Sequence, residues 1–287
     1  MNRRKLIKTE ELFFRGLMLL ATGMIIFALG LIIFSILWRG VPCLSWQMLS
    51  QTPKGGFYFG KEGGILNAII GSLYLSIGAT LLAVIIGLPL ALMMNVHLFR
   101  HRRFVNMMRF FLDLLWGVPS IVYGAFGFTL MIFFGMRTSL LAGIITVAIF
   151  ILPIMVRAMD EVLKTVPRGL MEASLSLGST KHETAFRVYL RQCIPGIITA
   201  VLLSFGRAIG DAASVLFTTG YTDNIPTSLM QPTATLPLSI FFQLGSPVPE
   251  VQDRAYASAV VLTLIVLTAS ILARVLTRKY NNHKIKF

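Results

Sequence analysis

The sequence predicts an all-α membrane protein with six transmembrane helices and with both termini in the cytoplasm. Three observations support this prediction. Hydrophobic residues make up 55% of the 287 residues, charged residues make up only 13%, and lysine and arginine concentrate in alternate loops. A soluble domain is about one quarter charged, so this composition favours a lipid environment. In a soluble chain the net charge of +14 would suit nucleic acid, but its alternating distribution indicates membrane lipid as the partner and no nucleic acid.

Six apolar runs are candidates for the spans, because an α-helix needs about 20 residues to cross the hydrocarbon core. They are residues 17–37, 65–94, 114–134, 140–156, 194–219 and 256–273. The first run is predicted to be an uncleaved span, since no small-residue cleavage site accompanies its basic N-terminal region. Pro89 is expected to kink the second run or to end its regular part.

The predicted orientation follows from the lysines and arginines between the runs. The N-terminal tail has five, the loops after the second and fourth runs have four and six, and the C-terminal tail has five. The loops after the first, third and fifth runs have only three, one and one. Cytoplasmic segments carry the excess of positive charge, so both termini are predicted to be cytoplasmic.

Residues 235–244 are apolar enough to suggest a seventh span. The segment is too short and contains Pro237, so we predict an interfacial or re-entrant segment instead. A seventh span would also place the basic C-terminal tail outside, against the charge rule.

Residues 160–195 form the only long stretch that is rich in both charges and helix formers. An apolar helical face precedes Gly178, and a second amphipathic turn follows it. Two short helices around a glycine break would make a compact knob that suits a groove on a partner protein. An ordinary solvated loop is the alternative interpretation.

The fifth run contains polar residues at helical spacing. They are Ser204, Arg207, Asp211, Ser214 and Thr218, at positions i, i+3, i+7, i+10 and i+14. On one continuous helix they would form a single polar stripe. Arg207 would then lie about 20 Å from the start of the helix, near the middle of the bilayer, where a charge that faces lipid is costly. The stripe is therefore expected to face protein or a water-filled path, with Asp211 partly neutralising Arg207.

An arginine at this depth suits an anionic solute, because its planar fork matches a tetrahedral oxyanion. The alternative is a structural pair of Arg207 and Asp211 that locks helices together. Gly206 and Gly210 have the small-xxx-small spacing that permits close helix packing, a spacing common in membrane helices.

In the third run, Pro119 would leave backbone groups without helical partners near Ser120 and Tyr123. A simple helix kink and a gating or path-lining role are both compatible with this pattern.

The sequence predicts no catalytic, metal or cofactor site. Residues 55–62 contain the glycines and Lys61 of a phosphate-binding loop, but Glu62 stands where serine or threonine is required. The histidines lack the spacing of metal ligands. They are His97, His101, His182 and His283.

The stretch 160–195 resembles the cytoplasmic loop of the permease subunits of ABC importers. The signature of that family reads Glu-Ala-Ala, three residues, Gly, nine residues and Ile-x-Leu-Pro. The residues in register are Glu172, Ala173, Gly178 and Leu190, and those that depart are Ser174, Val188 and Arg191. In the family this loop is a coupling helix that docks into a groove of the ATPase. The resemblance thus implies ATPase coupling by Glu172, Ala173, Ser174 and Gly178.

More specifically, the chain is similar to the phosphate permeases of the Pst system, of the PstA type. The runs that carry the similarity are GVPSIVYG (117–124), VPRGLMEASLSLGSTK (166–181), IPGIITAVLLSFGRAIGDAASVLFTTG (194–220) and LPLSIFF (236–242). The last run and the short N-terminal region favour PstA over its sister permease PstC. The family usually has glutamate where Asp211 stands.

The resemblance implies a type I ABC importer permease fold in a prokaryotic cell membrane. It implies an N-terminal part (1–64), a permease domain (65–279) and a cytoplasmic tail (280–287). The implied partners are a PstC-like second permease, a cytoplasmic ATPase dimer that binds the ATP, and an extracytoplasmic phosphate-binding protein. The predicted substrate path is then expected to carry phosphate past Ser204, Arg207, Asp211 and Ser214.

Three other functions remain open. The first is a permease of the same type for sulfate, molybdate or another solute. The second is an ion-coupled carrier without an ATPase, against which the coupling loop argues. The third is a structural or sensory membrane subunit.

Overall fold

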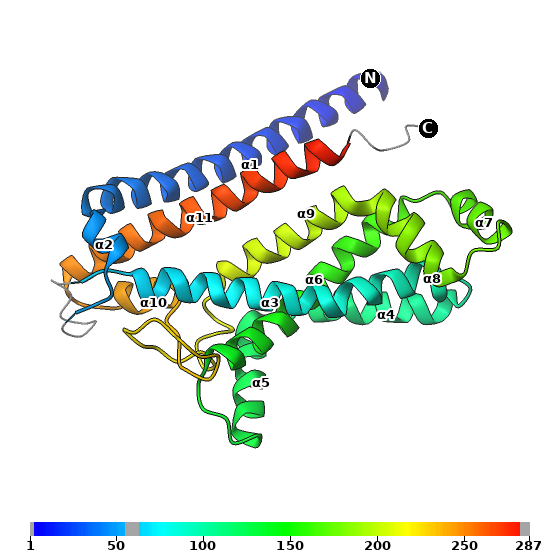
Figure 1. Ribbon diagram of the computed structural model, residues 1–287. Coiled ribbons are helices and arrows are strands. Elements are labelled where there is room, and N and C mark those ends of the chain that lie inside the picture. Colours follow the sequence, from blue (N-terminus) through cyan, green and yellow to red (C-terminus); the bar gives the residue numbers. More distant parts are fainter. Residues whose placement is uncertain (1–2, 55–62, 282–287) are drawn as a thin grey trace.

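The computed structural model describes residues 3–54 and 63–281, and Figure 1 shows a bundle of long helices. The α-helices are α1 (Arg3–Gly40), α2 (Trp46–Ser50), α3 (Leu66–Leu92), α4 (Arg102–Trp116), α5 (Ser120–Phe133), α6 (Leu140–Lys164), α7 (Arg168–Ser176), α8 (Lys181–Glu183), α9 (Leu190–Ile209), α10 (Leu236–Leu244) and α11 (Pro249–Asn281). A 3₁₀ turn (Val41–Cys43) follows α1, and π-helical segments extend α3 (Met93–His97) and precede α9 (Thr184–Tyr189).

The all-α membrane fold predicted from the sequence is confirmed. Five helical segments are long and apolar enough to cross a membrane, and a sixth crossing requires the bent pair of α4 and α5 to act as one span. The start of α1, the end of α11 and α7 lie at the same end of the bundle in Figure 1, as a topology with both termini in the cytoplasm requires. α10 has nine residues and is not one of the five segments, so the prediction that 235–244 is no span is confirmed.

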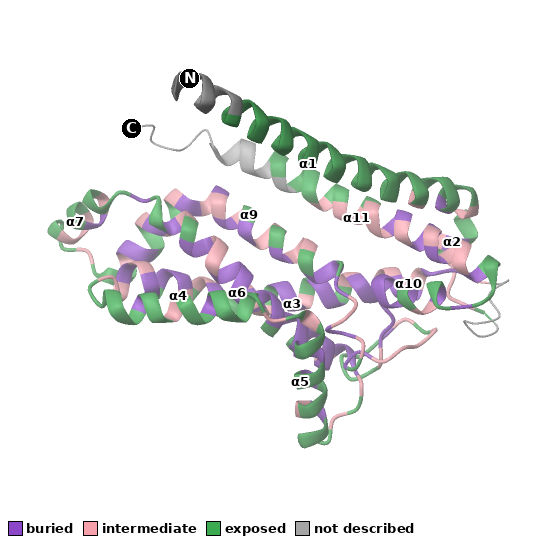
Figure 2. Cartoon of the chain, turned by 180° about the vertical axis from the view of Figure 1, so that it is seen from behind, coloured by how far each residue is buried: buried purple, intermediate pink, exposed green. Residues whose placement is uncertain are grey.

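The bundle has a protein-covered centre and a lipid-facing edge. α3, α6 and α9 pack together at the centre, and α4 lies along α6. α11 packs against α9 and α10 and carries α1 on its outer side (Figures 1 and 2). The share of buried residues differs over the most apolar stretch of each helix. It is 72% in α6 and 0% in α1. α1 is therefore a peripheral helix, whereas α6 is the central one.

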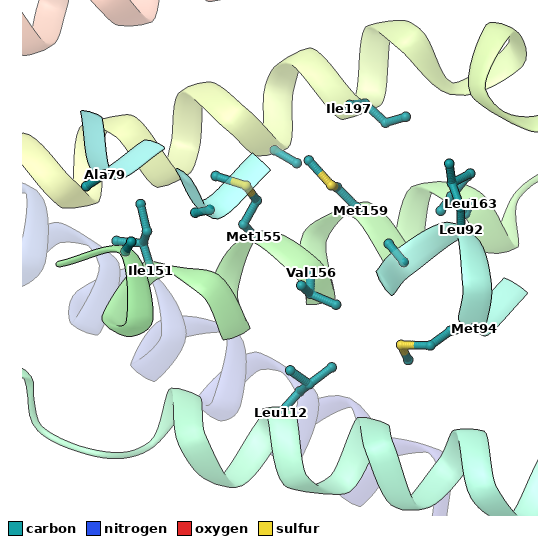
Figure 3. Close-up of a cluster of buried hydrophobic side chains, with 14 of the residues drawn as sticks. Ala79, Leu92, Met94, Leu112, Ile151, Met155, Val156, Met159, Leu163 and Ile197 are labelled. Carbon is teal, nitrogen blue, oxygen red and sulfur yellow. The ribbon is translucent and has the colours of Figure 1, made fainter. Parts of the chain in front are cut away.

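The main hydrophobic core lies between α3, α4, α6 and α9 (Figure 3). Met155 and Met159 of α6 are fully buried, and Leu112 of α4 closes the cluster from one side. Gly196 permits the close approach of α9, because a Cβ there would lie 2.3 Å from Cγ1 of Val162. Lipid is as apolar as these side chains, so close packing rather than exclusion of water holds the helices together.

Asp160 of α6 is a charged centre within this bundle. Its side chain is fully buried, and it accepts hydrogen bonds of 2.9 Å from Asn95, from Nε and Nη2 of Arg109, and from Nη1 of Arg157. The Nζ atom of Lys164 lies 3.0 Å from the same carboxylate. The partners come from the segment after α3, from α4 and from α6 itself, so one carboxylate connects three parts of the fold. Charged, hydrogen-bonded partners are what a buried carboxylate needs.

The predicted third span, residues 114–134, is broken near the proline for which a kink was one of the two interpretations. α4 ends at Trp116, α5 begins at Ser120, and the two helices differ in direction by 96°. Pro119, which has no N–H and an extended ψ of 139°, stands at the break. The Tyr123 hydroxyl donates a 2.8 Å hydrogen bond to the carbonyl oxygen of Leu115 and so satisfies a backbone group at the end of α4. α5 is only about 21 Å long and projects sideways from the bundle in Figure 1.

The prediction that residues 194–219 form one helix is wrong. α9 ends at Ile209, and residues 213–219 form turns. Backbone hydrogen bonds fix the irregular segment that follows α9 against the start of α6: Ser139 donates to Thr218 at 3.0 Å, and Leu140 donates to Gln231 at 2.8 Å. Non-helical backbone at membrane depth is tolerated where protein buries it, which is the case for this segment.

We expect Asp160→Asn to destabilise the chain strongly, because it leaves Arg109, Arg157 and Lys164 without their shared carboxylate. Removing one partner of a buried ion pair costs about 3–5 kcal/mol, and the partial exposure of the three cations favours the lower end of that range. Thermal unfolding of the purified chain in detergent measures the loss.

Asp113→Asn is the matched control for this prediction. Asp113 also pairs with Arg157, but its side chain is 48% exposed, and exposed ion pairs contribute only about 0–1 kcal/mol. Equal losses of stability in the two variants would contradict the central role of Asp160.

Candidate functional site

The last turn of α9 holds Arg207 on an open face of the bundle. Arg207 and Leu203 are exposed, and a Cβ placed on Gly206 would meet no atom within 4 Å. The Cζ atom of Arg207 lies 4.9 Å from the ring centroid of Phe150 in α6, which is a cation–π contact. The C-terminal end of a helix carries partial negative charge and further stabilises a cation there. Phe150 could not be predicted from the sequence, because an aromatic residue in an apolar run is ordinary.

The predicted neutralisation of Arg207 by Asp211 is wrong. The Oδ2 atom of Asp211 accepts a 2.8 Å hydrogen bond from the backbone N–H of Ser214, and Asp211 is buried. Asp211 therefore caps the turn after α9, as an N-cap residue caps a helix. The physical reason is the end of α9 at Ile209, since only a continuous helix would place Asp211 one turn beyond Arg207. Within the described residues, no carboxylate forms an ion pair with Arg207.

The predicted polar stripe divides into one exposed residue and a buried group. Ser204 is fully buried, and its hydroxyl donates to the carbonyl oxygen of Ala200 at 2.9 Å. Ser214 and Thr218 are also fully buried. Of the predicted path residues, only Arg207 reaches the open face of the single chain. A role of Ser204, Asp211 or Ser214 in a substrate path stays a prediction.

α5 supports the turn that follows Arg207. A Cβ on Gly124 would lie 2.9 Å from the carbonyl oxygens of both Ala213 and Ser214, so only glycine permits this approach. The rings of Phe128 in α5 and Phe217 in the turn are 6.1 Å apart between centroids. The broken third run thus positions the region around Arg207 through backbone contact rather than by lining a helical path.

α7 is an exposed amphipathic helix at the cytoplasmic end of the bundle. Met171 is 3% exposed and anchors α7 on the main core. Glu172 and Ala173 are exposed, and Leu177 is 87% exposed. The helix therefore presents both polar and apolar side chains to the cytoplasm, which is the surface that a groove on a partner can bind.

Gly178 ends α7 in a conformation that other residues avoid. Its φ is +84°, in the left-handed region. Its N–H donates to the carbonyl oxygen of Leu175 at 3.0 Å. Thr180 and Glu183 then begin the next helical segment through a capping box. The short helix, the glycine break and the second helical segment predicted for 160–195 are all present, although residues 160–164 and 190–195 belong to α6 and α9.

A continuous but bent helical segment, called the rod below, leads from the Gly178 turn to Arg207 (Figure 1), and it contains the π-helical part Thr184–Tyr189 and Pro195. The chain is helical from Lys181 to Ile209, so the turn at Gly178, called the coupling turn after the predicted coupling loop, and Arg207 are separated by about 40 Å along this segment. The hydroxyl oxygens of Ser174 and Thr184 lie 3.0 Å apart and connect α7 to the start of the rod. A displacement of α7 can therefore reach Arg207 through one element.

The other sequence motifs add no site. Residues 55–62, whose sequence partly matches a phosphate-binding loop, and His283 lie outside the described residues. Among residues 3–54 and 63–281, no three His, Cys, Asp or Glu side chains are grouped closely enough to hold a metal ion.

Comparison with known families defines the class of this membrane protein. Residues 83–283 match the family described as "Binding-protein-dependent transport system inner membrane component". This match covers more than half of the chain, so the chain belongs to that family of multi-pass membrane proteins.

Three curated relatives narrow the assignment, and each is a phosphate transport system permease protein PstA. The Yersinia pestis protein is 37% identical over 220 residues, which cover 76% of this chain and 73% of the relative. The Haemophilus influenzae protein is 32% identical over 281 residues, covering 96% and 95%. The Mycobacterium leprae protein is 38% identical over 213 residues, covering 73% and 68%. Within its family, the chain is a PstA-type permease.

Solved structures agree with the predicted permease fold. The inward-facing MetNI methionine ABC transporter has a TM-score of 0.61 at 18% identity, with 75% of this chain and 95% of that chain covered. A bacterial ABC transporter for the acidic polysaccharide alginate has a TM-score of 0.55 at 17% identity, with 96% and 98% covered. At these identities the likeness concerns the fold alone.

We expect Asp211→Asn to preserve the turn after α9, because an amide oxygen can accept the same hydrogen bond from Ser214. Asp211→Ala removes the acceptor and should lower the free energy of unfolding by about 1 kcal/mol, as loss of a capping residue does. Thermal unfolding of both variants measures the difference. If the Asn variant is as unstable as the Ala variant, the negative charge matters and the capping role is wrong.

We expect Gly178→Ala to destabilise the coupling turn by about 1–2 kcal/mol, because alanine is strained at positive φ. Gly169→Ala is the matched control: it also has open space around the new Cβ, but Gly169 lies in α7, where alanine favours the helix. Hydrogen exchange of the amides of residues 168–183 should become faster in the first variant and slower in the second. Identical exchange in both variants contradicts this account of Gly178.

Proposed function

We propose that the chain is the permease subunit of an ATP-driven importer for inorganic phosphate. The observation that carries the proposal is Arg207, an exposed arginine at the end of a membrane helix, in a chain whose relatives are named phosphate transport permeases. Phosphate is a tetrahedral oxyanion, and a guanidinium can donate two parallel N–H···O bonds to it.

The surroundings of Arg207 favour transient binding of an anion. Its contacts are the face of the Phe150 ring and the C-terminal end of α9, which stabilise the cation but leave its N–H groups free of any carboxylate within the described part of the chain. An incoming phosphate therefore does not have to displace a strong ion pair. Moderate binding is what a transport path requires, because the anion must also leave.

The proposed partners are those that the resemblance implies, and two exposed surfaces of the chain suit two of them. A cytoplasmic ATPase dimer binds α7 around Glu172, Ala173, Ser174 and Gly178 and holds the ATP, so this chain has no catalytic residue, metal or cofactor of its own. A second, PstC-like permease covers the open face of α9 at Gly206 and Gly210. An extracytoplasmic binding protein delivers phosphate to the other end.

The proposed mechanism is alternating access. Closure of the ATPase displaces α7, the rod from Lys181 to Ile209 transmits the displacement, and Arg207 changes the side to which it presents the anion. Buried Ser204, Asp211 and Ser214 line the path only after such a rearrangement or beside the second permease.

The test is uptake of radiolabelled phosphate by cells that express the chain with its partner subunits as their sole phosphate importer. We expect Arg207→Gln to reduce uptake at least tenfold, since a hydrogen bond to a charged group contributes about 1.5–3 kcal/mol. Arg137→Gln is the matched control, because Arg137 is an exposed arginine in the short loop before α6. Equal membrane abundance of the variants must accompany the comparison.

Normal uptake in Arg207→Gln would remove Arg207 from the anion path. Competition by sulfate or molybdate as effective as that by unlabelled phosphate would indicate a different oxyanion as the substrate. Loss of uptake on collapse of the ion gradient, with ATP maintained, would favour an ion-coupled carrier.

A further inference from the structure

A basic cavity opens at the cytoplasmic end of the bundle, far along the rod from Arg207. It has a volume of about 430 Å³, within the range of small-ligand sites. Five parts of the chain form its walls. They are α4, α7, the end of α6, the segment that follows α3, and the π-helical segment that precedes α9. The lining residues are Met94, Asn95, Phe99, Arg102, Val105, Asn106, Arg109, Leu163, Lys164, Val166, Arg168, Met171 and Tyr189.

The charges around the cavity are unbalanced. Four of its lining residues are cations, and no aspartate or glutamate lines it. Two of the cations, Arg109 and Lys164, are engaged by the buried Asp160 beneath the wall. Arg102 of α4 and Arg168 of α7 are exposed, and neither forms an ion pair or a side-chain hydrogen bond within the described residues. Two arginines that face one cavity from different helices repel each other unless an anion lies between them.

The chemistry of the lining selects a phosphate group. Arginine forks match the oxygens of phosphate in a bidentate geometry, and Asn106 adds an amide group without negative charge. α4 carries an exposed apolar face next to the cavity. That face comprises Phe104, Met107, Phe110, Phe111, Leu114 and Leu115. Lipid suits such a face on a helix of a membrane protein, and the cavity lies at the cytoplasmic end of the bundle, where phospholipid headgroups are expected.

We propose that this cavity is a second anion site, which binds a phosphate group between Arg102 of α4 and Arg168 of α7. The phosphate group belongs to an anionic phospholipid headgroup or to free inorganic phosphate. Because α7 is the docking helix of the proposed ATPase, the bound anion holds that helix against α4. The site does not depend on which solute the chain transports.

The experiment measures binding of two probes to the full chain, purified in an uncharged detergent. One probe is inorganic phosphate and the other is dioctanoyl-phosphatidylglycerol, each followed by isothermal titration. All variants carry Arg207→Gln, so that binding near Arg207 does not contribute. We expect Arg102→Gln with Arg168→Gln to weaken the binding of at least one probe about thirtyfold or more. Arg103→Gln, which removes the next arginine of α4 outside the cavity, should change the affinity less than twofold.

The two probes distinguish the sources of the phosphate group. Binding of phosphatidylglycerol alone identifies a lipid site, and binding of inorganic phosphate identifies a free-anion site. A second double variant, Arg102→Lys with Arg168→Lys, keeps both positive charges but lacks the guanidinium forks. It should bind the probe with intermediate affinity. It replaces the glutamine double variant in the test if that variant fails to fold. The proposal is overturned if neither probe binds, or if affinity is the same with and without the two arginines.

Discussion

The carboxylate of Asp160 must be compensated, because an ion that water cannot reach costs several kcal/mol unless charged partners surround it. Meeting this requirement fixes Asn95 after α3 and Arg109 of α4 beside α6. The position of α4 determines where α5 leaves the bundle, and Gly124 of α5 supports the turn beyond Arg207. The placement of the proposed functional arginine thus depends, through two helices, on an ion cluster in another part of the bundle.

The features that could be predicted from the sequence are those that the bilayer imposes. The length of an uncharged run identifies α3, α6 and α11, because hydrocarbon disfavours charges over the part of each helix that crosses it. The alternation of lysine and arginine orients these helices, and the shortness of α10 with Pro237 excludes a further span. The glycine at 178 also predicted the break after α7, since a left-handed turn has few other solutions.

The features that could not be predicted arise from contacts within the protein. Residues 210–219 continue the apolar run of α9 with one charge, and half of them are buried in the protein. Hydropathy does not distinguish such a buried turn from the end of a span. The break at Pro119 was visible as a proline, yet its angle of 96° depends on how α4 packs on α6. Asp211 followed three residues later by Ser214 has the spacing of a cap, which becomes informative only once the end of α9 is known. In the sequence, Asp160 is one of several charges in a polar stretch. Its role as a buried ion-pair centre becomes visible only when its partners in the folded chain are known.

The peripheral position of α1 has a consequence for how its sequence can vary. α1 contacts the rest of the bundle through α11, where Arg39 pairs with Asp253 and a Cβ on Gly40 would lie 2.5 Å from the carbonyl oxygen of Tyr256. None of the residues in its most apolar stretch is buried by the rest of the chain, and the family match begins only at residue 83. A bilayer requires a span of matching length and hydrophobicity, but it does not select the shape of each side chain. Exchanging one apolar residue for another along the apolar stretch of α1 should therefore leave the bundle intact, whereas a change at Arg39 or Gly40 would disturb the junction with α11.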